Sequence, residues 1–135
     1  MPLVRIDVEE AVTPAELQAI SNQIHEAIVE TFGIPVEDRF HVLNRLPSGS
    51  LVAEDAGLGF SRSASKTIVQ IFTQRGRSTD LKQSLYFAIA TRLESIGIPG
   101  TDVFIGYQEN GPEDWSFGFG RAQYLTGELS IPRAR

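Results

Sequence analysis

The sequence has no cysteine and only two histidines in 135 residues. Without cysteine there can be no disulfides, no thiolate catalysis and no cysteine-ligated metal, and His25 and His41 are too few for a convincing zinc centre. We therefore expect no dependence on a metal ion, and the reactions considered below need no cofactor either.

Basic residues are also few, with 12 Lys and Arg against 17 Asp and Glu and a net charge of −5. No global basic surface is expected that would attract nucleic acid or an anionic membrane, so any anion-binding site must be local. A long apolar run is missing as well, and the first residues carry charge from the fifth position onward, which argues against a signal peptide or a membrane span. We expect a cytoplasmic protein.

An internal repeat is the strongest pattern in the chain. The segment GIPVEDRF, residues 33–40, returns as GIPGTDVF, residues 97–104, and the same displacement places residues 3–8 on residues 67–72. The length and the 41% hydrophobic content fit one compact domain.

The repeat predicts a single domain over 1–135, made of a duplicated β-α-β unit. Its halves are residues 1–46 and 66–108, and a C-terminal tail that is expected to be loop-like follows at 111–135. Between the halves, the glycine- and serine-rich segment 47–65 is expected to be an ordered surface loop with room for a short hairpin.

Each half contains one amphipathic helix with clear start and stop signals. Thr13 to Glu16 forms a capping box with proline at the first helical position, and Gly33 ends the pattern. The second helix is predicted to start near Ser78 or Thr79 and to end at Gly97. The side chains expected to face inward are Leu17, Ile20, Ile24, Ile28 and Phe32 in the first helix, and Leu81, Leu85, Ile89, Leu93 and Ile96 in the second.

Strands are predicted after each helix, at residues 39–46 and 103–108, so each half becomes a parallel strand pair with a right-handed helical crossover. The predicted fold is α/β (α+β), a four-stranded sheet with two helices on one face. Residues 68–72 and 103–105 offer apolar side chains to both faces of that sheet, yet two helices cover only one. Partner subunits would cover the other, and we expect a homo-oligomer.

Pro2 is the first candidate for chemistry. Methionine before proline is normally removed, which would leave a secondary amine at the start of a strand, with an ordinary pKa near ~8. Such a nitrogen can act as base or acid at neutral pH.

Arg75 and Arg77 are the second candidate, at the end of a predicted strand. Two residues so close point the same way only if Gly76 bends the backbone between them. Two guanidinium groups can then hold a small carboxylate, although a solvated pair before a helix is the alternative. Asp38 and its repeat mate Asp102 both occupy a turn, so at least one of them can be purely structural.

Several separated motifs give the chain a resemblance to a known family. They are MPLVRIDV at the start, FGIPVEDRF after the first helix, EDAGLGFSRS in the loop, RGRS before the second helix and DWSFGFGRAQYLTGEL near the end. Together they resemble the tautomerase superfamily, and most closely its malonate semialdehyde decarboxylase group.

The resemblance implies a trimer of β-α-β subunits whose pocket surrounds the terminal proline and is partly built by neighbouring subunits. It places the catalytic proline on Pro2, the assisting aspartate on Asp38 and the two substrate-binding arginines on Arg75 and Arg77. The residues that it places in the apolar wall of the pocket are Trp115, Phe117, Tyr124 and Leu129.

Two reactions on a small 2-oxo or 3-oxo carboxylate are open at this point. If the arginines lower the pKa of the prolyl amine enough, Pro2 is a base and the enzyme is a keto-enol tautomerase. If ionised Asp38 keeps the amine protonated, Pro2 is an acid and the enzyme decarboxylates or hydrates, which the resemblance favours. A non-catalytic trimeric binding protein with the same pocket is the third possibility.

Overall fold

The computed structural model describes residues 1–131, so the last four residues of the predicted tail lie outside the described residues. The elements in chain order are β1 (Leu3–Glu9), α1 (Pro14–Phe32), β2 (Phe40–Leu46), β3 (Thr67–Gln74), α2 (Thr79–Glu94), β4 (Val103–Asn110) and the short helix α3 (Gln123–Thr126), with 3-10 turns at Gly100–Asp102 and Pro112–Asp114. The predicted β-α-β unit therefore occurs twice, as β1-α1-β2 and β3-α2-β4.

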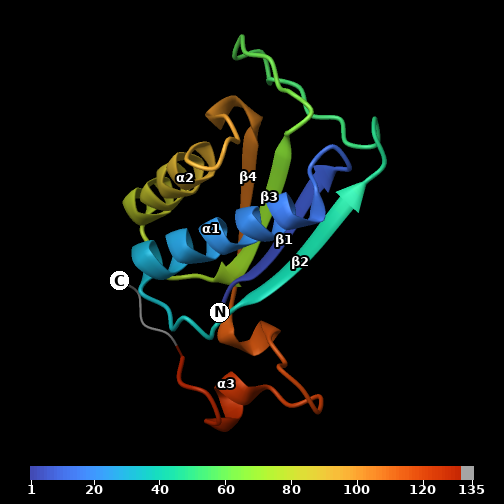
Figure 1. Cartoon of the computed structure of the whole chain (residues 1–135). Coiled ribbons are helices and arrows are strands. Elements are labelled where there is room, and N and C mark those ends of the chain that lie inside the picture. Colours follow the sequence, from blue (N-terminus) through green and yellow to red (C-terminus); the bar gives the residue numbers. More distant parts are fainter. Residues whose placement is uncertain (132–135) are drawn as a thin grey trace.

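The four strands form one mixed sheet in the order β2-β1-β3-β4, with α1 and α2 side by side on one face (Figure 1). β1 pairs with β2, and β3 with β4, in parallel, as the repeat predicts. The two halves join through the antiparallel pair β1–β3, in which Leu3 lies opposite Phe72. This register brings the start of the chain to the end of β3.

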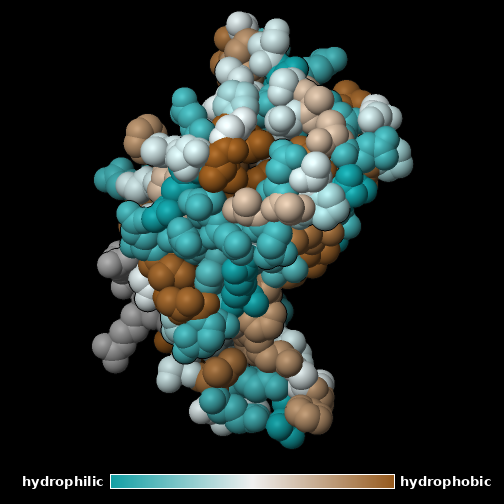
Figure 2. All heavy atoms as spheres, in the orientation of Figure 1, coloured by the Kyte–Doolittle hydropathy of each residue, from teal (hydrophilic) through white to brown (hydrophobic). Residues whose placement is uncertain are grey.

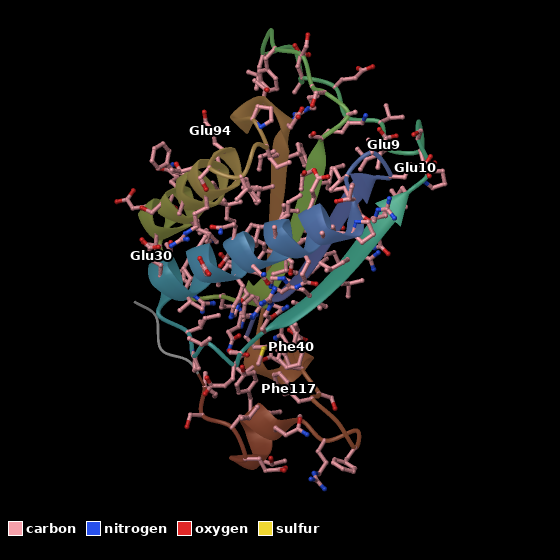
Figure 3. All side chains as sticks on the ribbon, viewed as in Figure 1. Glu9, Glu10, Glu30, Phe40, Glu94 and Phe117 are labelled. Carbon is pink, nitrogen blue, oxygen red and sulfur yellow. The ribbon has the colours of Figure 1, made fainter. Side chains whose placement is uncertain are left out.

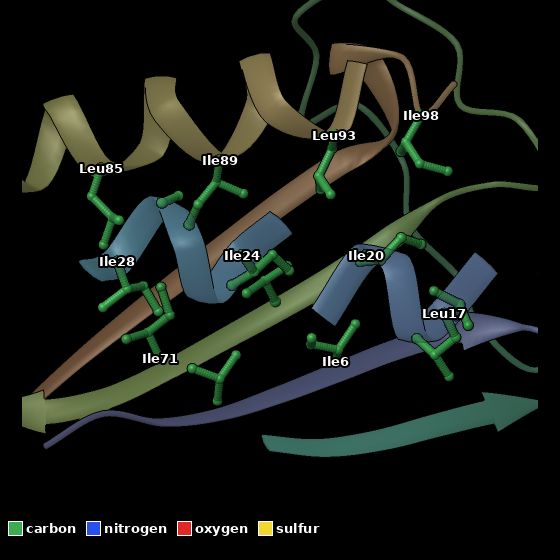
Figure 4. Close-up of a cluster of buried hydrophobic side chains, with 14 of the residues drawn as sticks. Ile6, Leu17, Ile20, Ile24, Ile28, Ile71, Leu85, Ile89, Leu93 and Ile98 are labelled. Carbon is green, nitrogen blue, oxygen red and sulfur yellow. The ribbon is translucent and has the colours of Figure 1, made fainter. Parts of the chain in front are cut away.

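The first helix follows the predicted signals. Thr13 accepts a hydrogen bond from the backbone nitrogen of Glu16 at 3.1 Å, and the Glu16 carboxylate accepts one from the Thr13 nitrogen at 3.4 Å. Gly33 closes the helix with φ 69°, a left-handed conformation that suits glycine. The apolar faces of α1 and α2 meet over the inward side chains of β1 and β3, and together form the core (Figure 4).

Three details differ from the sequence-based expectation. Helix α2 ends at Glu94, so Ile96 lies beyond it and is 38% exposed rather than inward. Residues 47–65 contain no strand, and the predicted tail contains α3. The loop is nonetheless held, because buried Asp102 accepts a hydrogen bond from the Ser63 nitrogen at 2.6 Å and another from the Ser63 hydroxyl.

Among residues 1–131, no helix lies over the second face of the sheet. Alternation along the strands turns Phe40 and Val42 of β2 and Phe104 of β4 to this face, and they are 43%, 40% and 50% exposed. The side that carries the helices is mainly hydrophilic, with its apolar side chains in small separate patches (Figure 2). Within residues 1–131, no helix is both long enough and apolar enough to cross a membrane.

Candidate active site

The amino terminus is buried at the end of the sheet where β1 begins and β3 ends. The Met1 ammonium donates a hydrogen bond to Gln74 Oε1 at 2.9 Å and lies 3.9 Å from Asp38 Oδ2. Pro2 is buried next to it. While Met1 is attached the Pro2 nitrogen is an amide, so the Met1 ammonium stands one residue before the secondary amine that removal of Met1 would create.

Asp38 reaches this amine from the turn between α1 and β2. Its backbone nitrogen donates to the Pro35 carbonyl at 3.1 Å, which closes the turn. Its Oδ1 atom is buried and has no hydrogen-bond partner among the described residues. The carboxylate therefore has a free acceptor next to the amine.

Arg77 is the buried cation of the group, only 9% exposed. Its Nη1 donates to Thr73 Oγ1 at 2.9 Å and to the Gln74 carbonyl at 3.2 Å, and its guanidinium lies 4.5 Å from the centre of the Phe32 ring. Gly76, with φ 131°, makes the bend before it, a conformation that residues with a side chain rarely adopt. The bend that the sequence requires is therefore present.

The structure does not bring Arg75 into this buried group. Its side chain is 62% exposed and its Nη2 lies 4.0 Å from Glu113 Oε1, at the limit of an ion pair. An exposed pair at this distance contributes little to stability. Of the two arginines, Arg77 is the one whose charge acts on the pKa of the amine.

Burial dominates the electrostatics of the amine and of Asp38. It lowers the pKa of the Met1 ammonium from 8.0 to about 6, with the Asp38 charge opposing the fall and Arg77 adding to it. Burial also raises the pKa of Asp38, against the fields of the ammonium, His25 and Arg77. Amine and carboxylate thus each lose some preference for the charged form, which suits groups that exchange a proton near neutral pH.

An aromatic cluster forms the wall of the site. Trp115 stacks on Phe117 with ring centres 6.2 Å apart, and Phe117 meets Tyr124 edge-on at 5.3 Å. Phe40 lies 5.8 Å from Phe117, and the two point toward one another across the site (Figure 3). Tyr124 is buried, and burial raises its pKa.

Two cavities of about 470 and 490 Å³ open at this wall, and Met1, Phe40 and Phe117 line both. The first also reaches Trp115, and the second reaches Asp38 and Leu129. Met1 is part of the wall of both cavities, so its removal would enlarge the space here and free the Pro2 nitrogen behind it. Such a pocket is mostly apolar with a few charged groups, as small-molecule sites commonly are.

Two residues of the site were not singled out in the sequence. Gln74 is 3% exposed and bonds to the amine, and Phe40 lines both cavities. Phe40 could have been found from the sequence, because it ends the repeated segment two residues after Asp38. For Gln74 there was no such signal, because a glutamine at a strand end is ordinarily read as a solvated residue.

The family described as "Tautomerase enzyme" matches this chain in two versions, one over residues 38–118 and one over residues 2–61. The chain is 38% identical over 130 residues to the probable tautomerase YrdN of Bacillus subtilis (strain 168). The aligned region covers 96% of this chain and 100% of that protein. The chain therefore belongs to the tautomerase superfamily and is an enzyme of that class.

Solved structures agree with this assignment. FG41 malonate semialdehyde decarboxylase inhibited by 3-bromopropiolate is 49% identical with a TM-score of 0.93, over 96% of this chain and 99% of that one. A second malonate semialdehyde decarboxylase, described with decarboxylase and hydratase activities, is 35% identical with a TM-score of 0.89, over 94% and 98%. A fused 4-OT described as a symmetric trimer shares the fold at 22% identity, with a TM-score of 0.74 over 93% and 98%.

Replacement by asparagine should have different effects at the two repeat-related aspartates. We predict that Asp102→Asn destabilises the protein by about 1.5–3 kcal/mol, because it weakens charge-assisted hydrogen bonds to Ser63. Asp38→Asn should change stability by less than about 1 kcal/mol, because Asp38 has an unpaired buried oxygen, and should instead lose turnover. Thermal unfolding and steady-state assays of both variants test this; equal destabilisation would contradict it.

Proposed function

We propose that this enzyme is a cofactor-independent decarboxylase of a small 3-oxo carboxylate such as malonate semialdehyde, with the Pro2 amine as its reactive group once Met1 is removed. The observation that carries the proposal is the buried group of terminal amine, Asp38, Gln74 and Arg77 in a chain that is 49% identical to a malonate semialdehyde decarboxylase. The cytoplasmic location stays a prediction.

In the proposed reaction Arg77 binds the substrate carboxylate and holds it out of the plane of the 3-carbonyl. The bond between the carboxylate carbon and C2 breaks, CO₂ leaves, and the electron pair moves into the carbonyl to give an enolate. The enolate then takes one proton at C2 from the Pro2 ammonium, which regains it from water, and the product is the aldehyde. The Pro2 ammonium would stabilise the carbonyl oxygen, because charge develops there in the transition state.

Asp38 has two tasks in this scheme. Its negative charge favours the protonated amine, against the burial that lowers the pKa at this place. Its free, buried Oδ1 can accept a proton from water, which would support addition of water to an unsaturated analogue. The apolar wall of Trp115, Phe117 and Tyr124 would keep bulk water from the carboxylate, and Leu129 lines the same pocket.

Keto-enol tautomerisation of a 2-oxo acid is the second candidate, favoured by the lowered pKa of the terminal ammonium. A neutral amine acts as a base, so kcat/KM would rise with pH through the pKa of the amine. In the decarboxylase the amine acts as an acid, so kcat/KM would fall as pH rises through that pKa. Turnover of malonate semialdehyde and of an enol 2-oxo acid, each measured from pH 5 to 9, separates the two.

Covalent labelling tests the role of Pro2. In protein shown by intact mass to lack Met1, we predict that 3-bromopropiolate modifies the terminal peptide in preference to both lysines. A prolyl amine near ~8 keeps a neutral fraction roughly a hundredfold larger than an ordinary lysine near ~10.4. Lys66 and Lys82 are also held by the carboxylates of Glu9 and Glu109.

Peptide mass mapping after limited labelling, with the adduct assigned to a single residue by fragmentation, gives the answer. In the matched control, the Met1-bearing protein, the Pro2 nitrogen is an amide and should carry no adduct, whereas the Met1 amine with its lowered pKa can be labelled. Adduct spread over the lysines, or none on Pro2, would contradict the amine chemistry. That result would favour the non-catalytic binding protein.

The two arginines supply a second test. Arg77→Ala should lower kcat/KM for the oxo acid about 10- to 100-fold, because it removes charge-assisted hydrogen bonds worth about 1.5–3 kcal/mol. Arg75→Ala, a matched change two residues away on an exposed side chain, should have a smaller effect. Thermal unfolding of both variants controls for the Thr73 and Phe32 contacts of Arg77. If the two variants lost activity to the same extent, both arginines would bind the substrate, as predicted from the sequence.

The homotrimer is the second part of the proposal. It is supported by the apolar face of the sheet that no helix covers, and by the fold shared with a fused 4-OT that is described as a symmetric trimer. In a trimer these faces would turn to the interior and bury Val42, Phe40 and Phe104. Burial of such apolar area is the main driving force of association.

Light scattering should give three times the subunit mass at micromolar concentration. Val42→Lys, on the uncovered face, should shift the protein toward monomer. Phe87→Lys, on the outer side of α2 where Phe87 is 75% exposed, should leave the mass unchanged. A wild-type protein that stays monomeric would contradict the trimer.

A further inference from the structure

A buried polar cluster lies behind the turn that carries Asp38, and the chemistry above does not use it. His25 of α1 is 5% exposed, and its ring meets that of His41 of β2 edge-on at 5.8 Å. His41 Nδ1 lies 2.7 Å from the Ser21 hydroxyl, and Arg39 Nη2 donates to the same hydroxyl at 2.8 Å. The cluster therefore ties the turn and the start of β2 to α1.

The contact of His25 with the turn is direct. Its Nε2 lies 2.6 Å from the backbone carbonyl oxygen of Val36. A carbonyl can only accept, so Nε2 carries the hydrogen and the imidazole is the donor. The other nitrogen, Nδ1, is buried without a hydrogen-bond partner among the described residues. The ring is thus oriented by this one bond and by packing.

The turn has few other restraints. Inside it, the backbone bonds are Asp38 nitrogen to Pro35 carbonyl at 3.1 Å and Arg39 nitrogen to Glu37 carbonyl at 3.0 Å. Val36 is 68% exposed, so its side chain adds little packing. The bond from His25 fixes the middle of the turn, two residues before the carboxylate that lies 3.9 Å from the terminal nitrogen.

We propose that His25 is a positioning residue: through its bond to the Val36 carbonyl it holds the Asp38 carboxylate at the distance from the terminal amine that the reaction requires. The proposal rests on the proposed function, in which Asp38 acts on the Pro2 amine. A shift of about 1 Å in a catalytic group can cost about 100-fold in rate, so a single anchor of this kind matters.

The charged and titratable groups near His25 come from every element packed around it. Asp38 of the turn and His41 of β2 interact with His25 directly. Around these two lie Glu37, Arg77 and the terminal ammonium, which act on Asp38, and Arg39, which acts on His41. The pKa of the amine is the most direct readout, because the Asp38 charge raises it. If Asp38 moves away, that pKa falls.

Two replacements of His25 distinguish anchoring from other roles. Glutamine places an amide nitrogen near the position of Nε2 and can still donate to Val36, whereas asparagine reaches only the position of Nδ1. We expect His25→Asn to lower the amine pKa by about half a unit or more. In the same variant kcat should fall about tenfold, with KM little changed because Arg77 is untouched. His25→Gln should keep the wild-type values.

The measurements are an NMR titration of the Pro2 nitrogen, steady-state kinetics and thermal unfolding, all in protein free of Met1. An unchanged amine pKa and kcat in a folded His25→Asn variant would overturn the proposal and leave His25 a structural residue. A loss in His25→Gln as large as in His25→Asn would also overturn it. Because the titration needs no substrate, it tests the anchor even if the enzyme does not decarboxylate.

If His25→Asn does not fold, two measurements still test the anchor. The tautomer of His25 in the wild-type protein can be read from nitrogen NMR, and hydrogen on Nε2 is expected. The amine pKa in His25→Gln is the second, and it should stay at the wild-type value. Hydrogen on Nδ1 instead, or a fallen amine pKa in His25→Gln, would overturn the proposal.

Discussion

The antiparallel pairing of β1 with β3 is the constraint on which the rest of the site depends. Each half of the chain is a self-similar β-α-β unit, and this pairing sets how the two halves meet. With Leu3 opposite Phe72, the start of the chain lies beside Gln74, at one end of the sheet. Asp38, in the turn before β2, and Arg77, after the bend that follows β3, lie at the same end. A slip of one residue would turn the core side chains of β1 to the wrong face, so the hydrophobic core also fixes the site.

The same burial that stabilises the fold tunes the chemistry. An amine, a carboxylate and a guanidinium lie together in a region of low dielectric, where each field is stronger than in water. Burial pulls the amine toward its neutral form and the carboxylate toward its protonated form, while their mutual attraction opposes both shifts. Burial is the larger effect on both groups, but the opposing attraction depends on the distance between them. A change in that distance therefore shifts both pKa values, so that one fold can support different proton states of the amine.

The sequence predicted most of the fold, because the repeat and the helix signals are local. The capping box at Thr13, the stop at Gly33 and the parallel pairing within each half are confirmed. The prediction was wrong where tertiary packing determines burial. Ile96 has the right spacing for the core, but it lies past the end of α2. In the site, the burial of Gln74 and the exposure of Arg75 depend on how the bend at Gly76 directs its neighbours, which spacing alone does not encode.

The position of Met1 in the wall of both cavities has a consequence for the preparation of this protein. An affinity tag at the amino terminus, or the one or two residues that a protease leaves behind, would turn the Pro2 nitrogen into an amide and place extra atoms where Met1 now lies. In the proposed mechanism such a preparation would lack the reactive amine and would show no turnover even when it is folded. A tag at the carboxyl terminus, with the mass of the first peptide checked, avoids mistaking an unprocessed enzyme for an inactive one.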